Sequence, residues 1–340
     1  MNRRTFLLGS AALAGCARDR RPRLNVFNWS DYIDPRTVPK FEAEHDVRVR
    51  YGIYESNEEM LARVFGGNSG WDIVFPTDYI VGPLRSQNLL APIDRALLPN
   101  LEHLEQRFQQ PDWDPRLEWS VPYMVIAAGI AYNKSLAPPP TSWTDLWSQR
   151  LARRMTMLDD PFDVMAACLK RLGDSINATD AGQLREAQRL AITQKPLLRA
   201  YLNAEVRDQL VSGDVLAAHM WNTTAQQAID ASPNIAFVYP AEGYAVYPDC
   251  AVILRESRHT ELAHQFINYL LRPEIAAANA LAARTTTTNA AARKLFPPAF
   301  RDNPTLYPPP EVVARGEWAK TTPPDAQRLR DRLWTEIKSA

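Results

Sequence analysis

The 340-residue sequence lacks the short motifs that mark common nucleotide-binding and hydrolytic sites. It contains no phosphate-binding loop, no GxGxxG dinucleotide fingerprint and no GxSxG nucleophile elbow. The five His residues are scattered, and no Cys/His spacing resembles a metal site. We therefore expect no metal, no cofactor and no enzymatic activity.

The sequence also has little cysteine and no excess of charge of either sign. Lys and Arg together number 39, as do Asp and Glu, which argues against a broad basic surface that binds nucleic acid. There are only three Cys residues. Cys168 and Cys250 either form a disulfide, which an oxidising compartment would permit, or remain two buried free thiols.

The first sixteen residues have the pattern of a targeting signal. Arg3-Arg4-Thr5-Phe6-Leu7 resembles a twin-arginine export motif, and the apolar run after it is too short to span a membrane. Leu13-Ala14-Gly15-Cys16 resembles a bacterial lipoprotein processing site. We expect twin-arginine export to the periplasm or cell envelope, with lipid anchoring at Cys16. The alternative is a chance pair of arginines in a cytosolic N-terminus.

The rest of the chain has the composition of a soluble globular protein, with 46% hydrophobic and 23% charged residues, and is long enough for two domains. Strand-like runs at 24–28, 47–53 and 71–76 alternate with helix-like segments near 36–44 and 57–65. This βαβ repetition predicts an α/β fold with a mostly parallel sheet.

Polar and aromatic side chains cluster where two of these strands end. Trp29-Ser30-Asp31-Tyr32 follows the first strand, and Thr77-Asp78-Tyr79 follows the third. Ligands of open α/β sheets bind beyond the carboxyl ends of strands. Ring faces and a carboxylate suit a small organic cation. The alternative is that the rings are core residues and the Asp caps a helix.

Two long apolar runs, 122–132 and 244–254, predict strands that cross between two lobes. Asp160 and Asp163 begin a helix three positions apart, so they form either a helix cap with a dipole complement or a carboxylate pair on one side. Further predicted strands are 155–158, 215–221 and 235–239, and further predicted helices are 261–271, 274–281 and 325–337.

Taken in order, these landmarks resemble the periplasmic polyamine-binding proteins of bacterial ABC importers, the spermidine and putrescine receptors. The resemblance covers nearly the whole chain after the signal. It rests on the blocks Asn28-Trp29-Ser30-Asp31-Tyr32, Tyr54-Glu55-Ser56-Asn57-Glu58, Pro76-Thr77-Asp78-Tyr79, Val121-Pro122-Tyr123, Ser142-Trp143-Thr144-Asp145-Leu146-Trp147, Met220-Trp221-Asn222, Phe266-Ile267-Asn268-Tyr269-Leu270-Leu271-Arg272-Pro273-Glu274, Asn289-Ala290-Ala291-Ala292-Arg293-Lys294 and Leu306-Tyr307-Pro308.

The resemblance implies an α/β, two-lobed periplasmic binding protein (type II) with a ligand cleft between lobes joined by crossing strands. The implied division is a signal at 1–16, a first lobe of 23–124 with 250–290, and a second lobe of 125–249 with 291–340. It also implies a monomer that captures a polyamine and delivers it to a membrane permease.

The family's ligand contacts can be carried over position by position. They comprise an aromatic box with hydroxyl and carboxylate groups nearby, two acidic contacts in the second lobe and an aromatic-x-Asp motif near the hinge. The corresponding residues are Trp29, Ser30, Asp31, Tyr32, Thr77, Tyr79, Asp160, Asp163, Trp221, Tyr247, Asp249 and Thr285.

This chain departs from the family pattern at five of its positions. Asp163 stands where the family has Glu and Tyr247 where it has Trp, and both changes preserve the chemistry. Thr285 replaces a Tyr and Ala319 a Gln, which opens space and removes a hydrogen-bonding partner. Arg284, if it faces the cleft, would oppose a cation and could hold a ligand carboxylate.

Three other functions are therefore considered. The same fold could bind a carboxylated amine, such as an amino-acid derivative or an opine-like compound. It could be a sensor or scaffold lipoprotein with no role in transport. Asp160 and Asp249 could also form the opposed carboxylates of a glycosidase-like site.

Overall fold

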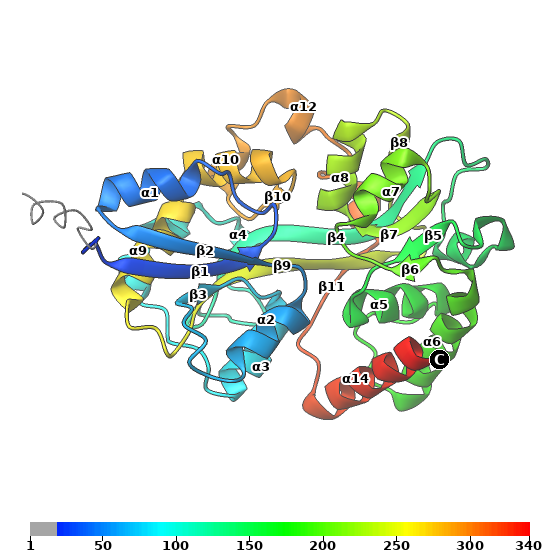
Figure 1. Cartoon of the computed structure of the whole chain (residues 1–340), viewed down its shortest axis with the longest axis horizontal. Coiled ribbons are helices and arrows are strands. Elements are labelled where there is room, and N and C mark those ends of the chain that lie inside the picture. The colour runs from blue at the N-terminus through cyan, green and yellow to red at the C-terminus, as the bar shows by residue number, and fades with distance from the viewer. Residues whose placement is uncertain (1–18) are drawn as a thin grey trace, which may run out of the picture.

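The computed structural model describes residues 19–340, so the export motif and Cys16 lie outside the described residues. Figure 1 shows two α/β lobes side by side along the long axis of the molecule. The strands β4 (Val121–Asn133) and β9 (Tyr244–Ile253) run through both lobes. The two-lobed α/β fold expected from the sequence is confirmed.

In the first lobe, β1 (Arg23–Trp29) pairs in parallel with β2 (Arg48–Tyr54) and with β3 (Ile73–Val74). The strands β1 and β2 match the predicted runs to within one residue at each end. The helical segments of this part are α1 (Thr37–His45), α2 (Asn57–Val64), α3 (Asp78–Ser86), the 3-10 turns Arg95–Leu97 and Pro99–His103, and α4 (Gln106–Gln109).

The start of α2 shows how a local pattern positions a side chain near the cleft. Ser56 is the N-cap, and its hydroxyl accepts a hydrogen bond from the backbone N–H of Glu59 at 3.1 Å. Glu58 and Glu59 lie in the first turn, where negative charge offsets the helix dipole. Because Ser56 caps the helix, the Asn57 amide is left to donate to the Thr77 hydroxyl at 3.0 Å.

The centre of the sheet is antiparallel, so the prediction of a mostly parallel sheet is wrong there. The crossing strand β9 pairs antiparallel with β3 and with β4, and β4 pairs antiparallel with β7 (Ala217–Trp221). The order along the main path of the sheet is β2-β1-β3-β9-β4-β7, followed by β5 (Met155–Met157) and β6 (Ala200–Tyr201). A chain that crosses on one strand and returns on its neighbour must run antiparallel at that point, and βαβ periodicity describes only the lobes on either side.

In the second lobe, β5 (Met155–Met157) pairs in parallel with β6 (Ala200–Tyr201) and with β7. Buried apolar residues of α5 (Pro161–Leu172) and α6 (Ala181–Gln194) form much of the core of this lobe. The remaining elements are the 3-10 turns Trp143–Trp147, Gln149–Leu151 and Lys195–Leu197, the helices α7 (Val206–Ser212) and α8 (Asn222–Ala231), and β8 (Ile235–Val238), which joins β4.

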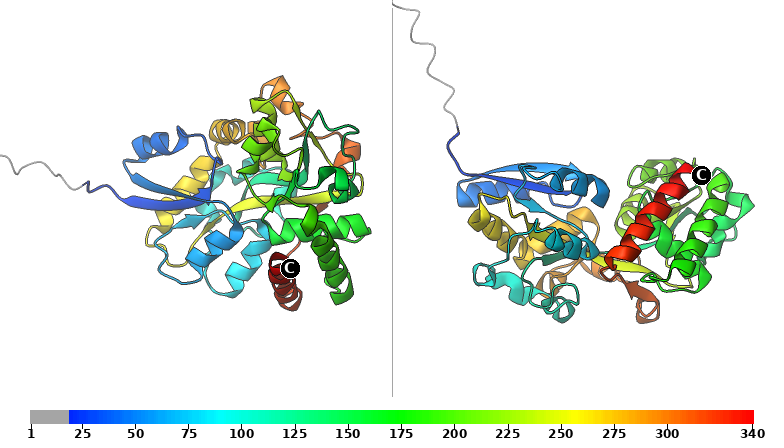
Figure 2. Two further views of the ribbon diagram at one scale, coloured as in Figure 1. Left: turned by 45° about the vertical axis from the view of Figure 1, so that its right-hand side comes forward. Right: turned by 90° about the horizontal axis from the view of Figure 1, so that it is seen from below.

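The last part of the chain contacts both lobes. In Figure 2, α14 (Pro324–Ser339) lies against the second lobe, where Leu333 and Ile337 are buried. The other elements are α9 (Thr260–Leu270), α10 (Pro273–Ala283), β10 (Thr286–Thr287), α11 (Ala290–Arg293), α12 (Pro298–Arg301), α13 (Pro310–Val313) and β11 (Gly316–Trp318).

The division into lobes proposed from the sequence stays a prediction. Its first two boundaries, at residues 124 and 250, fall inside β4 and β9, which belong to both lobes. Phe296 and Phe300, which that division assigns to the second lobe, pack with Ala276 and Ala280 of α10.

The two cysteines of the described region are buried free thiols in separate cores. Cys168 packs in the core of the second lobe, whereas Cys250 packs with residues of β1, α2 and α3. Within residues 19–340, no helix is both long and apolar enough to cross a membrane.

Candidate functional site

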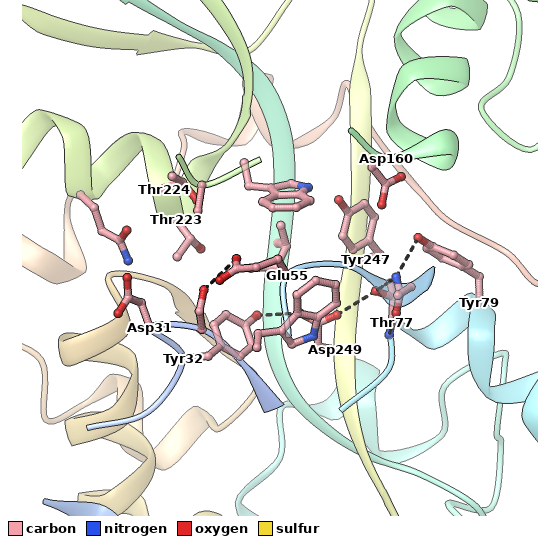
Figure 3. Close-up of a pocket in the computed structure, with 17 residues that line it drawn as sticks. Asp31, Tyr32, Glu55, Thr77, Tyr79, Asp160, Thr223, Thr224, Tyr247 and Asp249 are labelled. Atoms are coloured by element: carbon pink, nitrogen blue, oxygen red, sulfur yellow. Dashed lines mark hydrogen bonds between the residues drawn. The ribbon is translucent and has the colours of Figure 1, made fainter. Parts of the chain in front are cut away.

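A cavity lies between the two lobes, at the ends of β1, β3 and β7. Figure 3 shows side chains from both lobes converging on it. Of the predicted site residues, all but Asp163 and Thr285 line the cavity. The full lining is Trp29, Ser30, Asp31, Tyr32, Glu55, Asn57, Thr77, Tyr79, Ile126, Asp160, Ala204, Trp221, Thr223, Thr224, Gln227, Tyr247 and Asp249.

Trp29 and Trp221 bring aromatic surface to the cavity from opposite lobes. The Trp29 indole N–H donates to the carbonyl oxygen of Phe75 at 2.8 Å, which orients the ring at the end of β1. The ring centroids of Trp29 and Trp221 are 6.2 Å apart at an interplanar angle of 71°. Tyr79 stacks on Phe162 of the second lobe, with centroids 4.5 Å apart. These ring faces can contact a methylene chain or a cation.

Asp249 is a buried carboxylate of the lining that accepts hydrogen bonds from two hydroxyl groups. It lies on β9 with 3% of its surface exposed and accepts hydrogen bonds from the Tyr32 hydroxyl at 2.7 Å and the Thr77 hydroxyl at 2.9 Å. Burial raises its pKa to about 7, although the two hydroxyl donors oppose this. A ligand cation would relieve the cost of holding this charge away from water.

Asp160 and Asp163 have different positions, although they begin the same helix. Asp160 is the N-cap of α5 and accepts from the backbone N–H of Asp163 at 2.9 Å, so the capping interpretation is confirmed, and it also lines the cavity. Asp163 lies behind the lining, where its Oδ2 accepts from the Trp221 indole at 2.8 Å and the Tyr247 hydroxyl at 2.6 Å. It therefore orients two rings of the lining.

Both carboxyl groups have raised pKa values. Burial raises the pKa of Asp160 to about 6, against hydrogen bonds from backbone N–H groups. For Asp163, burial and the negative charge of Asp160 raise the pKa to about 8. The second oxygen of Asp163, Oδ1, is buried and has no hydrogen-bond partner among residues 19–340. This end of the cavity therefore favours either bound protons or a bound cation.

Thr285 and Arg284 do not reach the lining. Thr285 is fully buried and accepts a hydrogen bond from the Thr223 hydroxyl at 2.9 Å, so only Thr223 faces the cavity. Arg284 is the left-handed residue that ends α10, and its guanidinium pairs with Asp230 and donates to the carbonyl oxygen of Leu281. Ala319 is buried and bonded through its backbone to Val246.

Sequence reasoning did not identify seven residues of the lining. Thr223 and Thr224 follow the strand end at Trp221, the same signal that indicates Trp29–Tyr32. The 54–58 pattern predicts a helix cap, yet two of its side chains face the cavity. Ala204 and Gln227 carry no local signal, because their position depends on how the lobes meet. The seven are Glu55, Asn57, Ile126, Ala204, Thr223, Thr224 and Gln227.

The lining is acidic. Asp31, Glu55, Asp160 and Asp249 contribute to it, and within the described part of the chain no Lys, Arg or His does. Residues 19–340 contain no group of three or more His, Cys, Asp or Glu side chains placed to hold a metal ion. Carboxylates beside ring faces suit an organic ammonium ion, with charged hydrogen bonds at its ends and apolar contacts along its chain.

Comparison with known proteins agrees with this arrangement. Residues 37–308 match the family described as bacterial extracellular solute-binding protein. The chain is 30% identical to the spermidine/putrescine-binding periplasmic protein of Salmonella typhimurium, over 93% of this chain and 91% of that protein. It is also 30% identical to the putrescine/cadaverine-binding protein of Pseudomonas aeruginosa, over 98% of each chain.

A solved structure also shares this fold. The TpPotD lipoprotein of Treponema pallidum superposes with a TM-score of 0.82 at 30% identity, covering 93% of this chain and 99% of that one. The chain therefore belongs to the family of bacterial extracellular solute-binding proteins that includes the spermidine/putrescine-binding periplasmic proteins.

Proposed function

We propose that the protein binds a polyamine of the spermidine/putrescine class outside the cytoplasm and delivers it to the permease of an ABC importer. The observation that carries the proposal is the cavity between the lobes, where buried carboxylates lie beside aromatic rings and no basic side chain of residues 19–340 contributes to the lining. The names of the relatives agree with this ligand class.

The physical fit is that of a flexible chain with a cationic group at each end. Asp249 and Asp160 would accept hydrogen bonds from ammonium groups, and the rings of Trp29, Trp221 and Tyr79 would cover the methylene groups between them. Each cation–π contact contributes about 0.5–2 kcal/mol, more where water is excluded. Closure of the lobes removes water and strengthens the charge pairs. No bond is made or broken, so the protein binds without catalysis.

The position of Arg284 removes the main argument for a carboxylated amine as the ligand. That alternative depends on Arg284 facing the cleft, whereas its guanidinium pairs with Asp230 and does not contribute to the lining. A ligand carboxylate would instead meet Asp31, Glu55, Asp160 and Asp249, which are like charges.

A thermal-shift screen of the purified protein tests the ligand class. The panel holds putrescine, cadaverine, spermidine and spermine, with 4-aminobutyrate as a carboxylated amine. A ligand that binds only the folded state raises the melting temperature by mass action. We expect a rise with at least one polyamine and none with 4-aminobutyrate. A rise with 4-aminobutyrate alone would contradict the proposal.

We also propose twin-arginine export to the periplasm or cell envelope and lipid anchoring at Cys16, with the protein as a monomer. The motifs at 3–7 and 13–16 support this. Cys16→Ser should move the protein from the membrane fraction of cells to the soluble fraction, because it removes the acylated sulfur. Cys168→Ser is the matched control and should leave the distribution unchanged. Retention of the Cys16 variant in the membrane would contradict the anchor.

A further inference from the structure

One end of the acidic cavity already has a protein cation beside it. Asp31, at the turn after β1, lies 3.7 Å from a guanidinium nitrogen of Arg207 on α7, so the pair joins the two lobes. Asp31 has a φ of 50°, a left-handed conformation that Asp and Asn tolerate well. In Figure 3, Asp31 lies on the opposite side of the cavity from Asp160.

Arg207 is held in this position by Gln227, a residue of the lining. The Arg207 guanidinium donates to the Gln227 carbonyl oxygen at 3.1 Å, and the Gln227 amide N–H donates to the carbonyl oxygen of Ala283 at 3.2 Å. The Gln227 side chain satisfies both partners in only one orientation, because Arg207 can only donate and the Ala283 carbonyl can only accept. The guanidinium is thus directed along the rim of the cavity toward Asp31.

The rest of the cavity contrasts with this end. Among the described residues, no Lys, Arg or His lies within salt-bridge distance of Glu55, Asp160, Asp163 or Asp249. Glu55 accepts a hydrogen bond from the Ser30 hydroxyl at 2.9 Å, and Figure 3 places it between Asp31 and Asp160. A short diamine can therefore have an unpaired carboxylate at each end without reaching Asp31.

We propose that Arg207 takes the place of a ligand ammonium at Asp31 and so makes the site selective for a short diamine over a longer triamine. The inference rests on the polyamine function proposed above and names the residue that sets ligand length. A third ammonium directed toward Asp31 meets a carboxylate that is already paired and a guanidinium of like charge.

Calorimetric titration of putrescine and spermidine into wild-type and Arg207→Gln protein tests this. Wild type should bind putrescine more tightly than spermidine. The substitution should raise the ratio of spermidine to putrescine affinity by about tenfold or more, which is about 1.4 kcal/mol. Arg185→Gln, an exposed site on α6 with the same change of charge, should leave the ratio unchanged.

The double variant Asp31→Asn/Arg207→Gln tests whether Arg207 acts through Asp31. It should return the ratio to the wild-type value, because the freed carboxylate is gone while the amide keeps the left-handed backbone acceptable. A ratio unaffected by Arg207→Gln, or an equal loss of affinity for both amines, would overturn the inference and leave the polyamine function standing. Absence of binding of either amine to wild type would overturn both.

Discussion

At the scale of single residues, Asp249 carries the clearest prediction about binding. Asp249→Asn should weaken polyamine affinity by about tenfold or more, near 1.4 kcal/mol, because the amide removes the negative charge that a ligand ammonium would neutralise. Tyr32 and Thr77 donate to different oxygens of Asp249, so in Asn one hydroxyl can still donate to the amide oxygen while the other accepts from the amide N–H, and the protein should still fold. Isothermal titration with putrescine measures the effect.

Tyr32→Phe is the control for this prediction. It removes one hydrogen bond to Asp249 and leaves the carboxylate charged, so it should weaken affinity less than Asp249→Asn does. Unchanged affinity in Asp249→Asn would contradict the assignment of Asp249 as a ligand contact.

The raised pKa of Asp249 also leads to a prediction of how the stability of the ligand-free protein depends on pH. The pKa of Asp249 is raised from 3.8 to about 7 by burial, so between these values the folded state binds more protons than the unfolded state. Its contribution to the free energy of unfolding is therefore fully present below about pH 4 and lost as pH rises through 7. Asp249→Asn lacks this dependence.

Scanning calorimetry between pH 5 and pH 8 measures the difference. The melting temperature of Asp249→Asn relative to wild type should rise by about 2 °C or more over that range. A difference that is constant with pH would contradict the raised pKa. The comparison with wild type at each pH cancels the titration of distant carboxylates.

At the scale of elements, the start of α5 combines capping and binding in one side chain. Asp160 caps the helix through the backbone N–H of Asp163, and it also lines the cavity. Asp160→Asn keeps a capping oxygen and should change the free energy of unfolding by less than about 1 kcal/mol, whereas Asp160→Ala removes the cap and should cost about 0.5–2 kcal/mol relative to Asp160→Asn.

Both substitutions at Asp160 remove the charge, so both should weaken polyamine binding to a similar extent. Chemical denaturation and titration of the two variants separate the roles. Equal stability of Asn and Ala at this position would show that the cap contributes little. Full affinity in either variant would exclude Asp160 as a ligand contact.

Local sequence patterns predict the positions of strands and helix caps, but not which side chains of a helix start face the cavity. The strands β1 and β2 and the N-cap of α2 depend on residues close together in the chain. The structure places both strands within one residue of their predicted ends and confirms a cap at Ser56. The pattern at 160–163 could not distinguish which carboxylate faces the cavity. The outcome depends on Trp221 and Tyr247, which come from other strands. Both donate hydrogen bonds to Asp163 and so hold its carboxylate behind the cavity lining.

At the scale of the whole molecule, the cleft is bounded by lobes joined through β4 and β9. Contacts between the lobes include the hydrogen bond between Thr223 and Thr285 and the stacking of Tyr79 on Phe162. We expect a bound polyamine to hold the lobes together, so the radius of gyration from small-angle X-ray scattering should decrease on addition of putrescine. Asp249→Asn at the same putrescine concentration should show a smaller decrease.

A radius of gyration that is the same with and without saturating putrescine would contradict closure around the ligand. Titration calorimetry on the same sample shows that the ligand is bound. The measurement therefore separates absence of movement from absence of binding.

The amino-acid sequence by itself determined the alternation of strands and helices, the polar strand ends at Trp29–Tyr32 and Thr77–Tyr79, and the two long crossing strands. These features depend on side-chain periodicity and capping, which act between residues close in the chain. Only the tertiary structure decided that the crossing strands pair antiparallel, that Arg284 points to Asp230 and that Arg207 reaches Asp31. Those relations join distant segments, and they are set by how the two lobes pack around one sheet.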